Sequence, residues 1–362
     1  MKRIVLYIDT MYRGGAQRVM SNIISYLDHN NWEIVLCNDF VSDPNILQYT
    51  VPSRVKRVYL SDTIQGNVIL KNIKRMKNLR RIIIEEKPNC VLSFLGRPNL
   101  RLLIATIGLK VPKIVSVRND PKREYDSKVK AMLAKQLFKT ADGIVFQTSD
   151  ARQFFPISVQ KKSEIIFNPV DEVFYQAKAK ENCKNIITVG RLMPQKNQKC
   201  LIDAFSKIAS LFPEQRLIIY GDGPLLDELL DYAKEKNVSQ QVVFPGSITN
   251  VENYLAESEI FVLSSDYEGM PNALMEAMAV GVACISTDCP CGGPNTIIQD
   301  GVNGFLVPVG DADAISEKLR YLLEKPDMRK AAATEAKKSA AIFKSETIMK
   351  KWMDYITSIC TI

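Results

Sequence analysis

The chain has 362 residues and a formal net charge of +8, and 46% of its residues are hydrophobic and 24% charged. This length exceeds what one hydrophobic core usually supports, so we expect two folded domains, and the composition excludes a disordered chain. No window has the roughly 18 to 20 apolar residues that cross a bilayer, and scattered cysteines beside a single histidine argue against a zinc site.

Short apolar runs bounded by turn residues alternate with stretches of helical periodicity, the pattern of βα units around parallel sheets. The run at residues 4–8 is too short for the apolar core of a secretory signal, and Asp9 follows it, so we interpret it as a buried strand. The predicted strands are residues 4–8, 33–37, 55–60, 90–94, 113–117 and 143–147 in the first half, and 185–189, 216–220, 241–244, 260–263, 282–286 and 305–307 in the second. The sequence therefore predicts an α/β protein with two doubly wound parallel sheets. Cysteines in strand contexts, such as Cys37, are typical of buried reduced thiols and favour the cytoplasm.

Gly14 and Gly15 follow the first predicted strand and open the first predicted helix. Because glycine has no side chain, a phosphate or a sugar could approach the backbone closely at this turn. Glycines are also common in turns that bind nothing, and the two interpretations carry about equal weight.

Residues 71–84 combine helical apolar spacing with a dense set of cations. These cations are Lys71, Lys74, Arg75, Lys77, Arg80 and Arg81. Residues 1–168 carry 28 Lys and Arg against 14 Asp and Glu, a net charge of +14. One interpretation is a packed helix with solvated cations; the other is reversible binding of the first domain to anionic lipid. We expect the second, and hence a cytoplasmic protein peripheral to the inner face of the plasma membrane.

A proline at position 169 marks the predicted boundary between the domains, because the residue before a proline is biased away from helix. We therefore expect one Rossmann-like domain at residues 1–168 and a second at residues 169–345, facing a central cleft. Residues 346–362 contain a stretch of helical apolar spacing with no strand after it, and we expect this helix to cross back to the first domain.

Two glycine-containing loops follow predicted strands of the second domain. Gly190 opens a loop that carries Arg191 and Lys196, at the rim where ligands of parallel sheets bind. An Arg and a Lys five positions apart can converge on a diphosphate, although solvated loop charges are an equal alternative. Gly221 begins a Gly-Asp-Gly turn, but Leu226 stands where a dinucleotide fingerprint has its third glycine. We interpret this turn as a tight connection whose backbone approaches a ligand.

The segment 265–278 is the most informative part of the chain. It places Glu268 in a loop after a buried strand and Glu276 about one turn inside the following helix. Both carboxylates could be ordinary helix-terminal charges, but Glu276 is the lone charge on a helix that is otherwise apolar, and a buried charge needs a partner or a ligand. The loop and helix start also form an anion seat. Its residues are Gly269, Met270, Pro271, Asn272, Ala273 and Leu274.

Two further features indicate structure rather than chemistry. Asp311 and Asp313 form the one Asp-x-Asp sequence, but they precede a predicted helix and fit an N-cap and a first-turn acid. His29 lies in a polar turn, and we expect it at the surface. We predict no metal ion and no cofactor.

Taken together, these motifs resemble the family 4 glycosyltransferases with the GT-B fold, and the resemblance covers nearly the whole chain. It rests on the glutamate pair Glu268 and Glu276, on Arg191 and Lys196, and on the double glycine at 14–15. Within the family, residues 93–99, 116–120 and 288–294 are similar to transferases that add N-acetylhexosamines or hexoses to polyprenyl-diphosphate-linked oligosaccharides.

The resemblance implies a retaining transfer from a nucleotide sugar, which we expect to be a UDP-sugar, to a membrane glycan acceptor in surface polysaccharide or glycoconjugate assembly. It implies that Glu276 holds the ribose, that Glu268 contacts the sugar, and that Arg191 and Lys196 stabilise the diphosphate. Many members place a histidine in the first domain facing the sugar, and this chain has Arg118 or Asn119 in the equivalent place.

Two alternatives belong to other classes of protein. A sugar-nucleotide epimerase can share the two-domain architecture but needs acid and base groups that a single surface histidine does not supply. A non-catalytic partner subunit would keep the fold and lose the charged motif residues, which are intact here.

Overall fold

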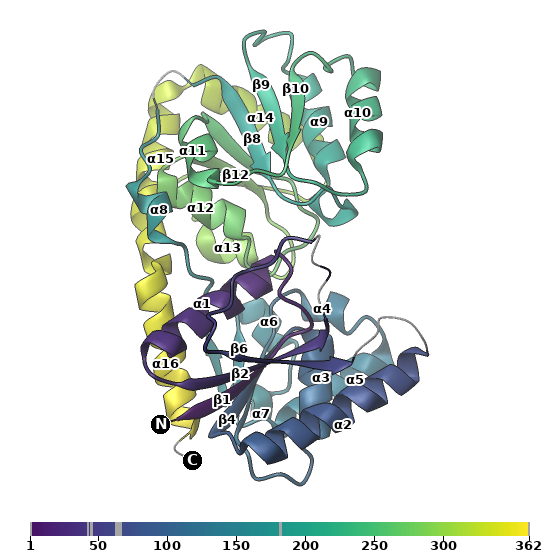
Figure 1. Ribbon diagram of the computed structural model, residues 1–362. Coiled ribbons are helices and arrows are strands. Elements are labelled where there is room, and N and C mark those ends of the chain that lie inside the picture. The colour runs from purple at the N-terminus through teal and green to yellow at the C-terminus, as the bar shows by residue number, and fades with distance from the viewer. Residues whose placement is uncertain (1, 42, 44–45, 62–66, 181–182, 361–362) are drawn as a thin grey trace. The chain divides into compact units, whose positions relative to one another are not determined.

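The computed structural model describes residues 2–41, 43, 46–61, 67–180 and 183–360. The chain divides into two compact units (Figure 1). Unit 1 consists of Met1–Pro169 and Glu346–Ile362, and unit 2 consists of Val170–Ser345.

Unit 1 contains a seven-stranded parallel sheet in the order β3-β2-β1-β4-β5-β6-β7. The strands are β1 (Arg3–Tyr7), β2 (Glu33–Phe40), β3 (Lys56–Ser61), β4 (Cys90–Phe94), β5 (Lys113–Ser116), β6 (Gly143–Phe146) and β7 (Ser163–Ile165). The prediction of a parallel sheet is confirmed, with the first six strands near their predicted bounds. The edge strand β7 was not predicted, because three residues with none fully buried leave no apolar run in the sequence.

The helices of unit 1 cover both faces of this sheet. They are α1 (Gly15–His29), α2 (Val68–Glu86), α3 (Gly96–Ala105), α4 (Pro121–Glu124), α5 (Lys128–Leu137), α6 (Ser149–Gln153), α7 (Ile157–Gln160) and α16 (Ser345–Cys360), with a 3-10 turn η1 (Phe138–Thr140). Helices α1 and α16 share one buried cluster with the strands. Right-handed crossovers place α2, α3 and α5 on the opposite face, where α2 contacts α3 and α3 contacts α5.

Unit 2 contains a six-stranded parallel sheet in the order β10-β9-β8-β11-β12-β13. The strands are β8 (Asn185–Val189), β9 (Arg216–Tyr220), β10 (Val242–Gly246), β11 (Ile260–Leu263), β12 (Ala283–Thr287) and β13 (Phe305–Val307). The helical segments are α8 (Glu172–Gln176), η2 (Pro194–Lys196), α9 (Gln198–Ser206), α10 (Leu226–Glu235), α11 (Val251–Ala256), α12 (Asn272–Val280), α13 (Gly293–Ile297), α14 (Ala312–Glu324), α15 (Pro326–Ser339) and η3 (Ala340–Phe343). This sheet too agrees with the predicted fold class.

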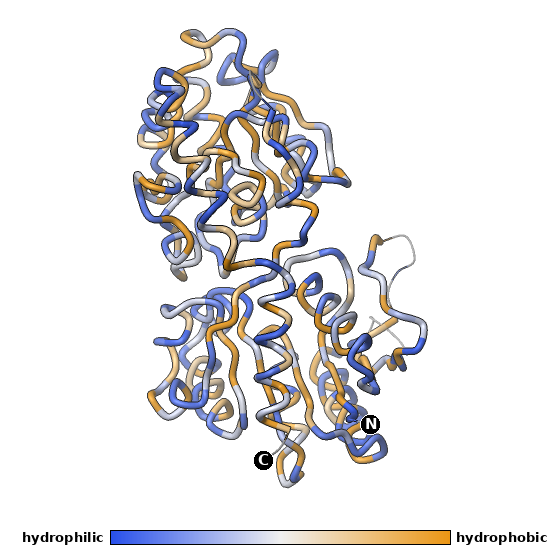
Figure 2. Tube along the Cα trace, turned by 90° about the vertical axis from the view of Figure 1, so that its left-hand side faces the viewer, coloured by the Kyte–Doolittle hydropathy of each residue, from blue (hydrophilic) through white to orange (hydrophobic). Residues whose placement is uncertain are grey.

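The last helix, α16, packs on the sheet of unit 1. Its buried residues recur at helical spacing, and Figure 2, which faces this helix, shows apolar and polar positions interleaved along it. Trp352 is fully buried with its ring 5.5 Å from that of Phe94, and the Tyr355 hydroxyl accepts a 2.8 Å hydrogen bond from the Ile144 backbone. Among the described residues, no helix combines the length and apolar character that crossing a bilayer requires.

Candidate active site

The order of the strands in unit 2 reverses between β8 and β11. The chain adds β9 and β10 on one side of β8, and β12 and β13 on the far side of β11. In open parallel sheets, ligands bind at the carboxyl ends of the strands beside such a reversal. The two loops that leave β8 and β11 carry Arg191, Lys196 and Glu268, so the fold brings the predicted charged residues to this point.

Lys196 and Glu268 make direct contact there. The Lys196 Nζ lies 2.6 Å from the Glu268 Oε1, and the Ser265 hydroxyl donates to the same oxygen at 2.7 Å. Both charged side chains are mostly withdrawn from solvent, which strengthens their attraction. The structure thus adds a contact that the sequence did not predict, because 72 positions separate the two residues.

A network of hydrogen bonds fixes the β8 loop against the β11 loop. The Asp266 N–H donates to the Gln195 carbonyl at 2.9 Å, and the Gln195 side chain donates to the Tyr267 carbonyl at 2.8 Å. The Asn197 amide donates to the Asp266 carboxylate, also at 2.8 Å. Because these bonds hold Gln195 and Asn197, on either side of Lys196, the Lys196 ammonium is held in one region of the site.

Backbone packing fixes the β9 turn against the β8 loop. Gly221 has a φ of +135°, and a Cβ atom there would lie 2.0 Å from the Gly190 carbonyl oxygen. A Cβ atom at Gly223 would lie 2.3 Å from the Leu192 carbonyl oxygen. Both positions therefore require glycine. The Leu192 N–H also donates to the Asp222 carbonyl at 2.9 Å, which closes the contact between the two loops.

Helix α12 begins directly after the Glu268 loop. Met270 and Pro271 are buried at its start, and Asn272 and Ala273 are half-buried. Its positive dipole end therefore lies on the same loop as Glu268. Glu276 is only 5% exposed within the buried stretch of the helix, which confirms that it is the lone charge on an apolar helix.

Arg191 differs from the other charged residues of this site. Its side chain is exposed, and within the part of the chain that the structure describes it makes no ion pair. Its charge is therefore available to an incoming anion, whereas the charge of Lys196 is shared with Glu268.

The predicted site residues of unit 1 lie on the loops that follow β1 and β5. Gly14 caps α1 and Gly15 is its first residue, directly after the loop that leaves β1. Arg118 follows β5, and its guanidinium lies 4.8 Å from the centre of the Phe94 ring and donates to the Asn168 side chain. Burial lowers the pKa of Arg118 to about 9. Its Nε and Nη1 have no hydrogen-bond partner among the described residues.

Asn119 is half-buried and accepts a 2.9 Å hydrogen bond from the Asp120 N–H. Asp120 in turn caps α4, because its carboxylate accepts from the Lys122 N–H at 2.9 Å. Asn119 therefore contributes to the turn that starts α4.

Glu124 is a half-buried residue with a solvent-inaccessible Oε2 atom, and the sequence did not single it out. It ends α4, and its carboxylate accepts a hydrogen bond from the Gly96 backbone N–H. Burial raises the pKa of Glu124 to about 7, and its Oε2 has no hydrogen-bond partner in the described residues. The short motif around it, Pro-Lys-Arg-Glu, is strongly polar and gives no sign of burial.

Asp311 and His29, which the sequence analysis interpreted as structural, lie at helix ends. Asp311 caps α14 by accepting a 2.9 Å hydrogen bond from the Ala314 N–H, as predicted. His29 is exposed at the end of α1, with its Nδ1 2.6 Å from the Ser25 carbonyl oxygen. Across the described ranges, no cluster of three His, Cys, Asp or Glu side chains is placed to hold a metal ion.

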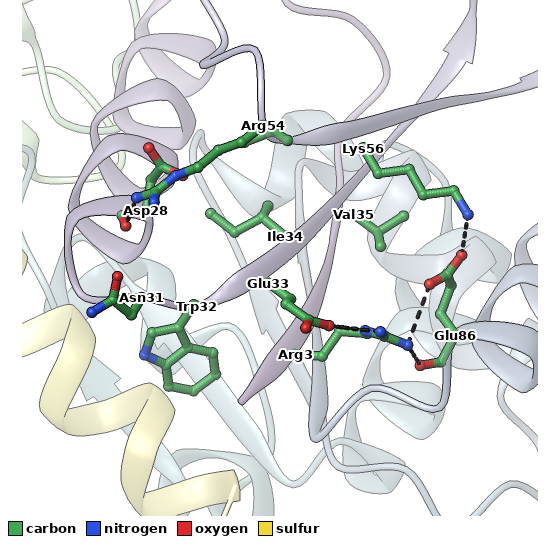
Figure 3. A pocket seen from close by; sticks show the side chains of 11 residues that line it. Arg3, Asp28, Asn31, Trp32, Glu33, Ile34, Val35, Arg54, Lys56 and Glu86 are labelled. Atoms are coloured by element: carbon green, nitrogen blue, oxygen red, sulfur yellow. Dashed lines mark hydrogen bonds and ion pairs between the residues drawn. The ribbon is translucent and has the colours of Figure 1, made fainter. Parts of the chain in front are cut away.

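A cavity of about 270 Å³ lies in unit 1, at the amino ends of β1, β2 and β3 (Figure 3). Its cations are neutralised by neighbouring acids: Arg3 contacts Glu33 at 2.6 Å and Lys56 contacts Glu86 at 2.5 Å. It also lies at the edge of the sheet opposite to the one where ligands bind. We therefore do not consider this cavity a candidate for the active site.

Comparison with known sequences gives matches over the whole chain. The profile of the family described as "Glycosyl transferases group 1" matches residues 170–339. The chain is 30% identical to the N-acetylgalactosamine-N,N'-diacetylbacillosaminyl-diphospho-undecaprenol 4-alpha-N-acetylgalactosaminyltransferase of Campylobacter jejuni, over 98% of this chain and 100% of that protein. It is 27% identical to the GalNAc-alpha-(1->4)-GalNAc-alpha-(1->3)-diNAcBac-PP-undecaprenol alpha-1,4-N-acetyl-D-galactosaminyltransferase of the same organism, over 99% of both.

Solved structures share the fold over nearly the full length. The crystal structure of Anabaena HepE in complex with UDP aligns with a TM-score of 0.81 at 17% identity, over 99% of this chain and 100% of that one. Sucrose-phosphate synthase from Thermosynechococcus elongatus aligns with a TM-score of 0.84 at 15% identity, over 99% of both. At these identities the likeness concerns the fold alone.

Proposed function

The chain belongs to the group 1 glycosyl transferases, a family of retaining hexosyltransferases with the GT-B fold, and on this premise we propose its substrates. It transfers a hexose or an N-acetylhexosamine from a UDP-sugar to a polyprenyl-diphosphate-linked or other membrane glycan, in the assembly of a surface polysaccharide or glycoconjugate. The reaction takes place in the cytoplasm, at the inner face of the plasma membrane.

The names of the relatives support this choice of substrates. Both Campylobacter proteins are named as N-acetylgalactosaminyltransferases that act on undecaprenyl-linked glycans, and HepE was crystallised with UDP. A further relative, 34% identical over 39% of this chain, is named as a UDP-Gal-dependent galactosyltransferase acting on a diphosphoundecaprenol acceptor. Hexoses and N-acetylhexosamines therefore both stay among the candidate donors.

The observation that carries the proposal is the Lys196–Glu268 contact at the strand reversal, beside the start of α12. When the bond between the sugar and the diphosphate breaks, negative charge builds up on the leaving UDP. Arg191, Lys196 and the dipole of α12 supply positive charge that stabilises this leaving group without a metal ion. Glu268 both orients the Lys196 ammonium and keeps an oxygen for a hydroxyl of the donor sugar.

The proposal also assigns contacts with the donor to Glu276 and to the glycine-containing loops of unit 2. Glu276 accepts hydrogen bonds from the ribose hydroxyls, because a carboxylate can accept two hydrogen bonds side by side from vicinal hydroxyl groups. Gly190 and Gly221 keep side chains out of the donor seat, and residues 269–274 supply backbone N–H groups. Unit 1 binds the acceptor, and Gly14, Gly15, Arg118 and Asn119 remain the predicted site residues of that unit.

The test is a transfer assay with a panel of UDP-sugars and a synthetic polyprenyl-diphosphate-linked glycan. We expect acceptor-stimulated release of UDP, and a product whose new bond has the anomeric configuration of the donor by proton NMR. An inverted product would contradict the proposal. Isomerisation of the UDP-sugar without acceptor would indicate an epimerase, and inactivity with every donor would indicate a non-catalytic subunit.

A further inference from the structure

Two cysteine side chains from opposite ends of the sequence of unit 1 touch in the fold. The sulfur atoms of Cys90 and Cys360 lie 2.7 Å apart, although 270 positions separate the two residues. Cys90 is the first residue of β4, and Cys360 is the last residue of α16, near the C-terminal end marked in Figure 1. Both are free cysteines. The fold therefore places two thiols in direct contact where the spacing of cysteines in the sequence gives no sign of a pair.

Hydrogen bonds hold the backbone on both sides of this contact. Cys90 pairs with Ile4 in the centre of the seven-stranded sheet. On α16, the Tyr355 hydroxyl accepts a 2.8 Å hydrogen bond from the Ile144 N–H, which fixes the helix to β6 five residues before Cys360. Because the sulfur atoms already touch, a bond between them, which is about 2.05 Å long, can form with little movement of the chain.

The two thiols differ in their access to solvent and in their ionisation. Cys90 is fully buried, whereas Cys360 is half-buried at the end of its helix. The neighbouring Cys90 thiol and then the Lys2 ammonium hold the pKa of Cys360 below its ordinary value, although burial opposes them. Burial alone has the opposite effect elsewhere and raises the pKa of Cys37, mainly for this reason, to about 12. The thiolate is the reactive form of cysteine, so Cys360 is the member of the pair that reacts first.

We propose that Cys90 and Cys360 form a modification site, at which hydrogen peroxide converts the two thiols into a reversible disulfide. An accessible thiolate beside a second, resolving thiol is the arrangement typical of redox-sensitive cysteines. The new bond ties the end of α16 to the central strand β4. This inference goes beyond the proposed function, and its tests need neither a sugar donor nor an acceptor.

The oxidation takes place in two steps. First, the Cys360 thiolate attacks one oxygen of the peroxide, and the O–O bond breaks. Cys360 becomes a sulfenic acid, and the second oxygen leaves as hydroxide, which takes up the proton of the Cys360 thiol and becomes water. Second, the Cys90 sulfur attacks the Cys360 sulfur, the S–O bond breaks, and the oxygen leaves as water with the Cys90 proton. The two thiols thus lose two electrons, which reduce the peroxide to two molecules of water. An added dithiol attacks the more accessible Cys360 sulfur and restores both thiols.

Thiol counting on the full chain tests the proposal. The chain has eight cysteines, so a maleimide titration of the reduced and then denatured protein should find eight thiols. After brief treatment of the folded protein with hydrogen peroxide, we expect a loss of two thiols and a mass lower by about 2 Da. Peptide mapping should show a cross-link between Cys90 and Cys360, and dithiothreitol should restore the full thiol count.

Single variants distinguish the two members of the pair. Cys360→Ser should lose no thiol in the time in which the unchanged protein forms the bond, because Cys90 is buried. Cys90→Ser should lose one thiol, as a sulfenic acid at Cys360 that dimedone traps. Cys183→Ser in unit 2 is the matched control, because Cys183 is also half-buried but its sulfur lies 3.4 Å from the Lys180 carbonyl oxygen. This variant should form the disulfide as readily as the unchanged protein.

The disulfide should also raise the Tm of unit 1 by about 5 °C, because it closes a long loop of the unfolded chain. Thermal unfolding followed by the fluorescence of Trp32 and Trp352, both in unit 1, measures this rise. It should be absent in Cys360→Ser and reversed by dithiothreitol. An unchanged thiol count after peroxide, or a cross-link between other cysteines, would overturn the proposal. So would disulfide-linked dimers on a non-reducing gel that Cys360→Ser abolishes, because Cys360 would then react with a second chain.

Discussion

The carboxyl edges of the two sheets hold their charged side chains in different ways. In unit 2, Lys196 and Glu268 come from neighbouring loops and meet at 2.6 Å, and Arg191 is open to solvent. In unit 1, Arg118 is buried and Glu124 is half-buried, and each keeps buried polar atoms without a hydrogen-bond partner among the described residues. The first edge is preorganised to receive an anion, whereas the second holds charge at a cost to stability.

This difference indicates which unit contributes charges to catalysis and which contains charges that lower the stability of the fold. Charges already held at the binding edge, or open to an incoming anion, stabilise a leaving group, so substitutions at the unit 2 edge should affect catalysis more than folding. Buried charges without full hydrogen bonding penalise the folded state, so substitutions at the unit 1 edge should change stability and its pH dependence. The predictions below test this contrast in order of expected effect.

The largest effect is expected from Arg191→Ala and Glu276→Ala in unit 2. Each should lower turnover about 100-fold or more, equivalent to about 2.7 kcal/mol of transition-state stabilisation. Steady-state kinetics of purified variants, with circular dichroism as a check of folding, gives the result.

Arg320→Ala is the matched control, because Arg320 is exposed on α14 and pairs with Glu324 at 2.8 Å within the same helix. It should retain full activity. A folded Arg191→Ala or Glu276→Ala variant with near-normal turnover would show that the catalytic charges lie elsewhere.

A glycine pair tests the backbone packing of the unit 2 site. Gly221→Ala should destabilise unit 2 by about 3 kcal/mol, because the new Cβ would meet the Gly190 carbonyl and the positive φ disfavours alanine. Gly301→Ala shares the positive φ but has open space around it, and should cost only about 1 kcal/mol. Differential scanning calorimetry measures both, and equal losses would mean that the close approach of the two loops does not matter.

The pH dependence of stability tests the unit 1 edge. The folded pKa of Glu124 is about 7, above its ordinary value, so the folded protein keeps a proton that the unfolded chain loses between about pH 4.5 and 7. The contribution of this group to stability therefore falls as pH rises through that window. The lowered pKa of Arg118, about 9, acts at higher pH and leaves this window unaffected.

Glu124→Gln should remove this slope and stabilise unit 1 by about 2 kcal/mol at neutral pH. Urea unfolding followed by tryptophan fluorescence is suitable, because Trp32 and Trp352 both lie in unit 1. Asp120, whose carboxylate caps α4, gives the contrasting variant Asp120→Ala, which should destabilise unit 1 by about 1 kcal/mol. An unchanged pH slope in Glu124→Gln would mean that the carboxyl group ionises normally.

The smallest effect is expected from a chelator. Because Arg191, Lys196 and the start of α12 supply the positive charge at the leaving group, excess EDTA should leave turnover unchanged. Complete loss of activity that added Mg²⁺ or Mn²⁺ restored would contradict this assignment.

The sequence predicted the features that depend on local pattern. Strands β8, β11 and β13 begin and end at their predicted residues, because each is a short apolar run between turn residues. The burial of Glu276 followed from the apolar residues around it on α12.

Features that depend on tertiary contacts were not predictable in this way. The pairing of Lys196 with Glu268 joins two loops far apart in the chain, and the inaccessible carboxylate oxygen of Glu124 lies in a polar segment. The engagement of Arg75 with Asp39 likewise depends on how α2 packs on the sheet. A sequence pattern shows that such residues are charged, but the partner of each charge is set by the fold.

The central claim is that the UDP part of the donor binds at the strand reversal of unit 2. Titration calorimetry with UDP alone tests it most directly, because binding needs neither the sugar nor the acceptor. We predict one site per chain, with affinity reduced about tenfold or more in Glu276→Gln and Lys196→Ala and unchanged in the unit 1 variant Lys77→Ser. Undetectable binding to the unaltered protein, or equal affinity in folded Glu276→Gln and Lys196→Ala, would contradict the claim.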